Sequence, residues 1–283
     1  MRDAEPTVEH ARTALRDAMV VSVRDLSINS HGRMLPLRLY TPPGAGPFAV
    51  LMFFHGGGWV TGDLDTHDGF CRHMCEWAGC AVVAVDYARP PEHVFPAAVD
   101  DCCVATQWAN DQGLSLGLDT SRMAVAGGGS GGGLAAVISQ WAVARGSPQI
   151  VLQILLYPLL DCLANTPSHA MFAEGYGLTG KMLEWYIDHY VPSDVCRANP
   201  RLSPVRQQHL RGLPPALIIT CEYDVLRDEG REYVRRLTEA DVPVQHKEYA
   251  GMTHGFLNYP ARCDEAKQAL LLCAQCLQKH FSR

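Results

Sequence analysis

The chain has 283 residues, of which 47% are hydrophobic and 19% are charged, and its formal net charge is -6. This balance is typical of a globular protein with ample core and excludes a disordered chain. Acidic and basic residues are scattered without a basic block, so neither a nucleic acid nor an anionic membrane surface is expected as a partner.

Targeting and redox signals are weak. Residues 1–16 alternate charged and small side chains, which does not fit a signal peptide, and no apolar run approaches the length of a membrane span. The 11 cysteines lack the paired Cys/His clusters of a zinc site. Cys71 with Cys75, and Cys273 with Cys276, fall in helical patterns, where we expect buried thiols and no metal. We therefore expect a reduced, cytoplasmic protein, and the sequence leaves open whether it forms a homodimer.

The first predicted elements are a helix and three strands. Apolar residues at near-helical spacing predict a short helix over 6–19. Alternation of period two predicts antiparallel strands over 20–28 and 35–40. A turn rich in proline and glycine follows, and then residues 48–54 form a continuous apolar run, which is typical of a strand buried on both faces.

From this point predicted strands and helices alternate. The remaining strands are expected over 81–86, 123–126, 150–156, 216–220 and 244–249. Helices are expected around 67–77, 96–110, 134–144, 228–240 and 261–280, with Asp100 and Asp101 facing solvent. This order predicts an α/β fold, a mostly parallel sheet covered on both faces, within a single domain over 1–283. Active sites of such sheets collect at the carboxyl ends of the strands.

Residues 161–204 interrupt the alternation. They contain aromatic and helical material and no predicted strand. An insertion of this size above the functional edge of a sheet is a candidate lid or pocket wall, although aromatic residues at helical spacing also fill cores. The residues that we expect to line a substrate pocket are Trp59, Phe172, Tyr176, Leu178 and Trp185.

The glycine-rich stretch 127–133 lies between an apolar strand and a helix-forming run. Gly128, Ser130 and Gly132 fit G-x-S-x-G, the nucleophile elbow of acyl-transfer enzymes, with Ser130 as nucleophile. A dinucleotide-binding G-x-G-x-x-G also fits, but it expects an acid about 20 residues later, and the next strand reaches its first acid only at Asp161. A flexible linker is the third interpretation, but linkers do not separate an apolar strand from an apolar helix.

Three further strand ends decide between these interpretations. The strand over 48–54 runs into HGGGW, whose glycine N–H groups suit an oxyanion hole made by Gly56 and Gly57 with Gly131. Asp224 and His254 follow the strands over 216–220 and 244–249, in the chain order of α/β-hydrolase triads. His254 would act as base and Asp224 would orient it, with Glu222 as the rival acid. Replacing Ser130 by Ala is then expected to abolish p-nitrophenyl ester turnover.

These motifs together resemble one family. HGGGW at 55–59, Asp86-Tyr87 followed by PEH and FPAA, the elbow, DVLRDEG at 224–230 and HGF at 254–256 are similar to the hormone-sensitive-lipase family of α/β-hydrolase carboxylesterases, over about 23–256. The resemblance implies hydrolysis of short- to medium-chain esters through an acyl-enzyme, without a metal or organic cofactor. It also implies a cap formed by 1–20 and 161–204.

The elbow departs from the family pattern. The family elbow usually reads GDSAGG, whereas this chain has Gly129 and Gly131 on either side of its serine, and Ala88 follows Asp-Tyr in place of the usual arginine. Two other functions stay open, of which the altered elbow motivates the first and the retained Ser130, Asp224 and His254 disfavour the second. One is a relative repurposed for acyl transfer, dehydration or cyclisation, and the other is a ligand-binding module without turnover.

Overall fold

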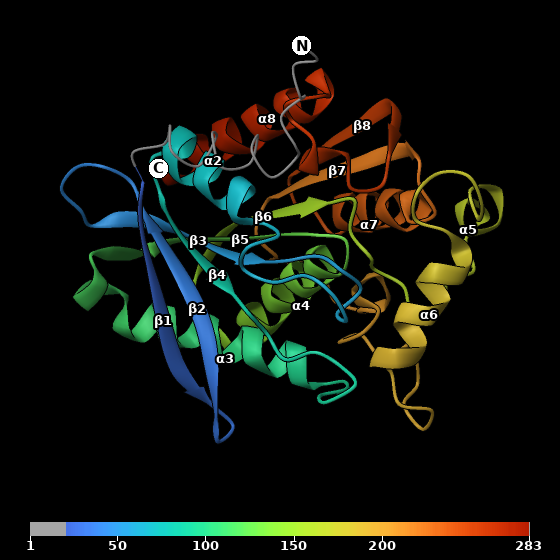
Figure 1. Ribbon diagram of the computed structural model, residues 1–283, viewed down its shortest axis with the longest axis horizontal. Coiled ribbons are helices and arrows are strands. Elements are labelled where there is room, and N and C mark those ends of the chain that lie inside the picture. The colour runs from blue at the N-terminus through green and yellow to red at the C-terminus, as the bar shows by residue number, and fades with distance from the viewer. Residues whose placement is uncertain (1–20, 283) are drawn as a thin grey trace, which may run out of the picture.

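A mixed sheet forms the centre of the protein, as seen in the computed structural model, which describes residues 21–282 (Figure 1). Its strands are β1 (Ser22–Ser30), β2 (Arg33–Thr41), β3 (Phe48–Phe54), β4 (Ala81–Val85), β5 (Leu118–Gly128), β6 (Ile150–Leu156), β7 (Ala216–Tyr223) and β8 (Val244–Thr253). The spatial order is β1-β2-β4-β3-β5-β6-β7-β8. β2 pairs antiparallel with β1 and β4, and every other pair is parallel. The predicted α/β fold is confirmed.

Helices cover both faces of the sheet. Those of the described residues are α2 (Asp68–Ala78), α3 (Ala97–Gln112), α4 (Ser130–Arg145), α5 (Pro167–Met171), α6 (Gly180–Tyr190), α7 (Arg227–Glu239) and α8 (Asp264–Phe281). α2 and α8 lie on one face, and α3, α4 and α7 lie on the other (Figure 1). The predicted helix over 6–19 lies outside the described residues. Within 21–282, none of the helices combines the length and apolar character of a membrane span.

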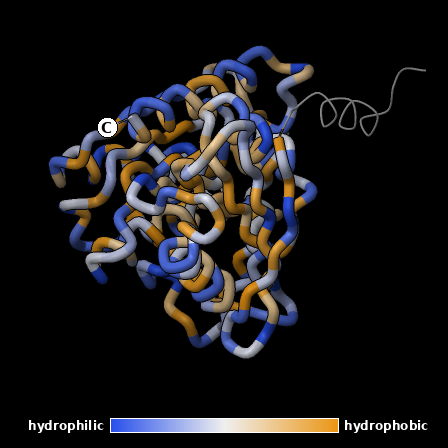
Figure 2. Tube along the Cα trace, turned by 90° about the vertical axis from the view of Figure 1, so that its left-hand side faces the viewer, coloured by the Kyte–Doolittle hydropathy of each residue, from blue (hydrophilic) through white to orange (hydrophobic). Residues whose placement is uncertain are grey.

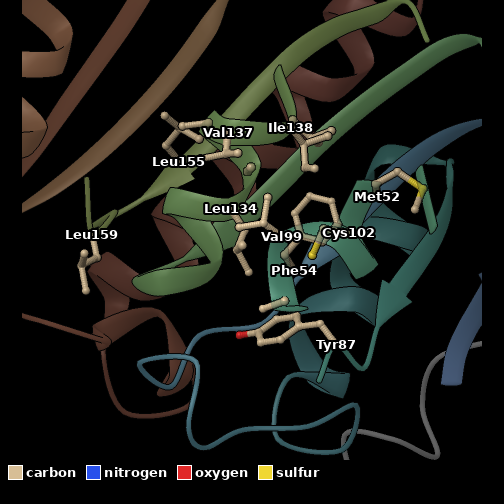
Figure 3. Packing of buried hydrophobic residues seen from close by; sticks show 14 of the residues in the cluster. Met52, Phe54, Tyr87, Val99, Cys102, Leu134, Val137, Ile138, Leu155 and Leu159 are labelled. Carbon is tan, nitrogen blue, oxygen red and sulfur yellow. The ribbon is translucent and has the colours of Figure 1, made fainter. Parts of the chain in front are cut away.

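Strand β3 shows why its residues are apolar without alternation. Leu51 and Phe53 belong to the cluster beneath α2 and α8, whereas Met52 and Phe54 belong to the cluster beneath α3 and α4. Figure 3 shows Phe54 beside Cys102 of α3, with Met52 in the same cluster. Successive side chains of a strand point to opposite faces, so a strand covered on both sides needs apolar residues at every position. In Figure 2 hydrophobic segments accordingly run through the interior, and hydrophilic ones lie mostly outside.

The paired cysteines are buried, as predicted. Cys71 and Cys75 of α2, and Cys273 and Cys276 of α8, all lie in the core cluster between these helices and the sheet. Burial raises the pKa of Cys75 to about 12 and that of Cys276 to about 11. Thiols with such pKa values stay neutral at pH 7 and act as small hydrophobic side chains.

The expectation that Asp101 faces solvent is wrong. Its side chain is fully buried, and its carboxylate accepts hydrogen bonds from Ser30 Oγ at 2.5 Å, Arg33 Nη2 at 2.6 Å and the Ala88 N–H at 2.9 Å. Asp101 lies on the same helical face as its buried neighbour Ala98, and this face points into the sheet. Three donors from three segments replace the water that the carboxylate loses.

Residues 161–204 contain α5 and α6 and no strand, as predicted. The start of α5 is joined to the start of α7 by hydrogen bonds. The Ser168 N–H donates to Asp228 Oδ2 at 2.9 Å, and Ser168 Oγ donates to the Val225 carbonyl at 2.7 Å. Since Val225 directly follows Asp224, this junction fixes the insertion beside one of the predicted site residues.

Glu229, in the first turn of α7, is an unusual carboxyl. It is 1% exposed, its Oε1 accepts the Leu160 N–H at 2.8 Å, and its Oε2 lies 3.8 Å from His169 Nε2, too far for a hydrogen bond. Burial raises its pKa well above the ordinary value. Burial also lowers the pKa of His169, so this ring does not supply a compensating charge, and Glu229 holds a proton in the folded protein at pH values where the unfolded chain has lost it.

This burial predicts a pH-dependent effect of Glu229→Gln. The raised pKa means that the wild type loses stability as the pH rises above the ordinary glutamate value, by up to about 1.4 kcal/mol per pH unit. The uncharged glutamine removes this loss. The free energy of unfolding of the variant, minus that of the wild type, should therefore increase from pH 5 to pH 8 in urea titrations. Glu239→Gln, at an exposed position of the same helix, is the control. Parallel pH profiles for Glu229→Gln and wild type would contradict the assignment.

Candidate active site

The ends of β7 and β8 bring together an imidazole and a carboxylate. His254 Nδ1 lies 2.8 Å from Asp224 Oδ2, and Asp224 is 2% exposed. The other carboxylate oxygen accepts the Leu226 N–H at 3.0 Å. The Tyr157 ring meets the imidazole edge-on at 4.8 Å. A proton on Nδ1 shared with the carboxylate leaves the lone pair on Nε2 free to act as a base.

The rival acid has a different task. Glu222 Oε2 accepts the Gly251 N–H at 2.7 Å, which links the ends of β7 and β8. Asp224 is therefore the carboxylate that holds the imidazole, and Glu222 braces the strand that carries it.

The elbow has its sharp backbone turn at Gly129. This residue caps α4 with φ 55° and ψ -120°, a conformation that side chains rarely adopt. Its N–H donates to the Leu156 carbonyl at 3.0 Å, and its carbonyl accepts the Leu159 N–H at 2.8 Å. A Cβ placed on Gly129 would lie 3.3 Å from His254 Nε2. The free nitrogen of the imidazole thus faces residue 129.

Ser130 lies one residue later, in the first turn of α4. It lines the same pocket, yet it is only 2% exposed, and its Oγ accepts the Trp59 N–H at 3.2 Å. No hydrogen bond joins Ser130 to His254 in the part of the chain that the structure describes. Of the three predicted triad residues, the structure therefore brings Asp224 and His254 together and turns the hydroxyl of Ser130 elsewhere.

The predicted oxyanion loop lines the same pocket as the imidazole. Gly56, Gly57 and Gly58 all line the pocket. Gly57 has φ 118°, and a Cβ there would lie 2.2 Å from the Thr61 carbonyl oxygen, so only glycine fits. The Gly56 N–H approaches His67 Nε2 at 3.4 Å, a weak contact that an anion could displace.

His55 and Gly131 contact this loop but are not among the residues that line the pocket. His55 is buried, stacks on Tyr87 at 4.1 Å and has its Nδ1 2.8 Å from the Gly56 carbonyl oxygen, so it shapes the loop. Burial lowers its pKa to about 3, which keeps the ring neutral. The third predicted donor, Gly131, faces the carbonyls of Phe54 and His55 and is not among the residues that line the pocket.

The pocket has a volume of about 540 Å³. Besides the elbow, the glycine loop and His254, it is lined by Thr61, Gly62, Thr66, His67, Tyr157, Leu159, Leu178, Met182, Leu183, Tyr186, Leu226, Gly255, Asn258 and Tyr259. None of these residues is a lysine, arginine, aspartate or glutamate. Among residues 21–282, no group of three histidine, cysteine or acidic side chains is placed to hold a metal ion. The lining therefore suits a neutral ligand with apolar parts and a few polar groups.

Only one of the predicted pocket residues lines the pocket. Leu178 does so, whereas Trp59 is buried and stacks on Tyr190 at 4.5 Å. Phe172 and Tyr176 pack against each other and against Tyr223. The outer face of α6 carries Trp185, which is 47% exposed.

The inner face of α6 supplies pocket residues that the sequence did not predict. Met182, Leu183 and Tyr186 line the pocket, and a Cβ on Gly58 would collide with the Tyr186 ring at 2.2 Å. The spacing of Met182 and Tyr186 by four residues indicates a shared helical face, but it does not say which face points inward.

Comparisons with known proteins agree on the family. A family model described as alpha/beta hydrolase fold matches residues 51–258. The carboxylic ester hydrolase LipN of Mycobacterium tuberculosis is 44% identical over 244 residues, which make up 84% of this chain and 65% of the relative, slightly less than two thirds of its length. The ethyl acetate hydrolase of Pseudomonas putida is 37% identical over 264 residues, 92% of this chain and 83% of that protein.

Solved structures agree as well. The ester-hydrolase EH1AB1 from the metagenome of Lake Arreo, in complex with a bipyridine phosphonate derivative, has a TM-score of 0.90 and 35% identity over 97% of this chain and 90% of that chain. The hyperthermophilic esterase of the archaeon Pyrobaculum calidifontis has a TM-score of 0.90 and 34% identity over 96% and 90%. The motifs, the fold and these relatives together show that the chain belongs to the hormone-sensitive-lipase family of α/β-hydrolases, the family of these ester hydrolases.

Proposed function

We propose that this protein hydrolyses neutral carboxylic esters in the pocket beside Gly129. The observation that carries the proposal is the hydrogen bond of 2.8 Å between His254 Nδ1 and Asp224 Oδ2, with Nε2 facing the elbow. Relatives named as carboxylic ester hydrolase, ethyl acetate hydrolase and esterase support the same reaction.

The residues divide the reaction between them. His254 Nε2 would take the proton of the attacking hydroxyl and return it to the leaving alcohol, while Asp224 holds the tautomer and stabilises the imidazolium. The N–H groups of Gly56 and Gly57 would stabilise the negative oxygen that forms when the carbonyl carbon is attacked. The backbone holds these donors before substrate binds, so the oxyanion has to displace only the weak contact between the Gly56 N–H and His67 Nε2.

The insertion over 161–204 would act as a cap within a single domain. α6 supports this because it contributes Met182, Leu183 and Tyr186 to the pocket, and the α5–α7 junction ties the insertion next to Asp224. The proposed second part of the cap, residues 1–20, lies outside the described residues.

The predicted role of Ser130 as nucleophile stays a prediction with a direct test. For this role its Oγ must leave the Trp59 N–H and turn toward His254 Nε2. A fluorophosphonate probe followed by peptide mapping reports whether this hydroxyl is reactive. Label on Ser130 would support the sequence-based assignment. An unlabelled Ser130 would mean that this residue is not the nucleophile.

Charge selectivity tests the ester proposal. Among residues 21–282 the pocket lining contains no lysine or arginine, so a carboxylate in the acyl group would be desolvated without a cationic partner from these side chains. We expect p-nitrophenyl butyrate to be hydrolysed with a kcat/KM at least about tenfold above that of mono-p-nitrophenyl succinate. Release of p-nitrophenol, corrected for spontaneous hydrolysis, measures both. Equal rates for the two esters would speak against turnover in this pocket.

Ligand binding without turnover is the second candidate, and the glycine at position 129 favours it. Without a nucleophilic side chain opposite the base, the pocket could serve recognition alone. Saturable binding of esters, with p-nitrophenol release no faster than buffer, would support this candidate against hydrolysis.

A further inference from the structure

We infer that residue 129, and not residue 130, occupies the nucleophile position of this elbow, so that hydrolysis proceeds by attack of water activated by His254, without an acyl-enzyme on Ser130. The inference rests on the proposed function for the reaction itself. Its structural part concerns the frame of the elbow, by which we mean which residue of 127–133 occupies the nucleophile position of G-x-S-x-G. This part stands on three separate observations of the described residues.

The first observation is the backbone conformation. A nucleophile elbow holds its nucleophile on a sharp, strained turn between strand and helix. In this chain the strained residue is Gly129, with φ 55° and ψ -120°, whereas Ser130 already belongs to α4. The residue held between the strand and the helix is therefore the glycine.

The second observation is where glycine is required. In G-x-S-x-G the two glycines lie two residues before and after the nucleophile, where a side chain would collide with backbone. A Cβ on Gly127 would lie 2.2 Å from the Gly131 carbonyl oxygen, and one on Gly131 would lie 2.0 Å from the Phe54 carbonyl oxygen. Gly128 and Gly132 would meet side-chain atoms at 3.2 Å and 2.8 Å. The tightest backbone contacts thus fall at 127 and 131, and the frame is centred on 129.

The third observation is the direction of the functional groups. His254 Nε2 lies 3.3 Å from the Cβ position of residue 129, so a hydroxyl carried there would be within reach of the base. The hydroxyl of Ser130 instead accepts the N–H of Trp59, at the end of the glycine loop, at 3.2 Å. Ser130 is a positioning residue that ties the glycine loop to the core.

The frame also changes the third oxyanion donor. That donor is the N–H of the residue after the nucleophile position, which is the backbone N–H of Ser130. Ser130 lines the pocket and Gly131 does not.

Without a serine nucleophile, water is the only further reactant that the hydrolysis needs. His254 Nε2 takes one proton from water as its oxygen bonds to the ester carbonyl carbon, and the carbonyl oxygen becomes the oxyanion. When the intermediate collapses, the bond to the alkoxy oxygen breaks and the leaving alcohol takes the proton from the imidazolium. One ester and one water give one acid and one alcohol, and no covalent intermediate forms. This route lacks the help of an oriented nucleophile, so turnover is slow.

Replacing Gly129 by Ser, with Gly129→Ala as the matched control, tests the frame. Both variants carry the same strained Cβ close to His254, but only serine brings a hydroxyl. We expect Gly129→Ser to raise kcat for p-nitrophenyl butyrate by at least about 10²-fold over both wild type and Gly129→Ala, since loss of a serine nucleophile elsewhere costs far more than this. A fluorophosphonate probe should label position 129 of this variant, and it should leave the wild-type protein unlabelled.

Circular dichroism establishes whether the Gly129 variants fold. If they do not fold, labelling of the wild-type protein and the turnover of Ser130→Ala still test the inference. Wild-type protein labelled at Ser130 overturns the inference. So does a Ser130→Ala variant whose turnover falls to background, because a positioning role predicts a loss of less than about tenfold, in kcat and not in KM. A folded Gly129→Ser variant no faster than Gly129→Ala overturns it too.

The outcomes distinguish failure of the inference about residue 129 from failure of the proposed ester hydrolysis. Wild-type protein without ester turnover, together with an active Gly129→Ser variant, refutes hydrolysis by this chain and supports the frame. Wild-type turnover that depends on a labelled Ser130 supports hydrolysis by this chain and refutes the frame centred on Gly129.

Discussion

Replacing His254 by Ala should lower the turnover of p-nitrophenyl butyrate by about 10² to 10⁴-fold, because the reaction loses its general base and acid. Asp224→Asn should act similarly, since an amide holds the imidazole in the wrong tautomer and cannot stabilise its charged form. Both effects should appear in kcat, with KM nearly unchanged. The Gly129→Ser variant offers a second background in which to measure them if wild-type turnover is slow.

The control for these variants is His93→Ala. His93 is exposed in the loop after β4 and does not line the pocket. Its replacement should leave kcat within about twofold of wild type, as expected for a surface position away from the reaction. Wild-type turnover retained in His254→Ala would mean that the activity does not arise at this site.

Replacing Asp101 by Ala should lower the free energy of unfolding by about 3 to 5 kcal/mol. The substitution leaves the Ala88 N–H, the Ser30 hydroxyl and the Arg33 guanidinium without the carboxylate that they share. Unpaired polar groups in the interior keep the full cost of their lost hydration. Urea unfolding followed by tryptophan fluorescence measures the change.

The neighbouring residue supplies a matched control for Asp101. Asp100 has the same side chain in the same turn of α3, but its carboxylate is partly exposed and pairs with Arg201 at the surface. Asp100→Ala should cost no more than about 1 kcal/mol, because exposed ion pairs contribute little. Similar losses for the two variants would show that the buried network does not stabilise the fold.

The strands themselves and the place of the site could be predicted from local patterns. The apolar run of β3 is long enough and bounded clearly enough by its turn and by HGGGW to define a buried strand. Asp224 and His254 each follow the end of a predicted strand, and the parallel strands β7 and β8 bring such ends to one edge of the sheet. Hydrophobic patterning carries this information because burial on one or both faces constrains every position of a strand.

Other features could not be read from the sequence. An aspartate in a helical pattern is expected to face solvent, as we expected for Asp101. Its burial depends on hydrogen-bond donors from β1, β2 and the loop after β4. On α6 both faces carry large apolar or aromatic residues, so Tyr186 and Trp185 are equivalent candidates until the helix is packed. Burial of a polar group or the choice of a helix face depends on partners far away in the chain.

The sequence by itself determined the α/β architecture, the family and the residues Asp224 and His254, because these follow from periodicity, strand ends and chain order. Only the tertiary structure decided the frame of the elbow. Residues 127–133 are glycine except for one serine, so two frames of G-x-S-x-G differ by a single step and sequence spacing selects the one that contains serine. The folded backbone selects Gly129, because the strained turn, the collisions at Gly127 and Gly131 and the direction of His254 Nε2 depend on atoms that only folding brings together.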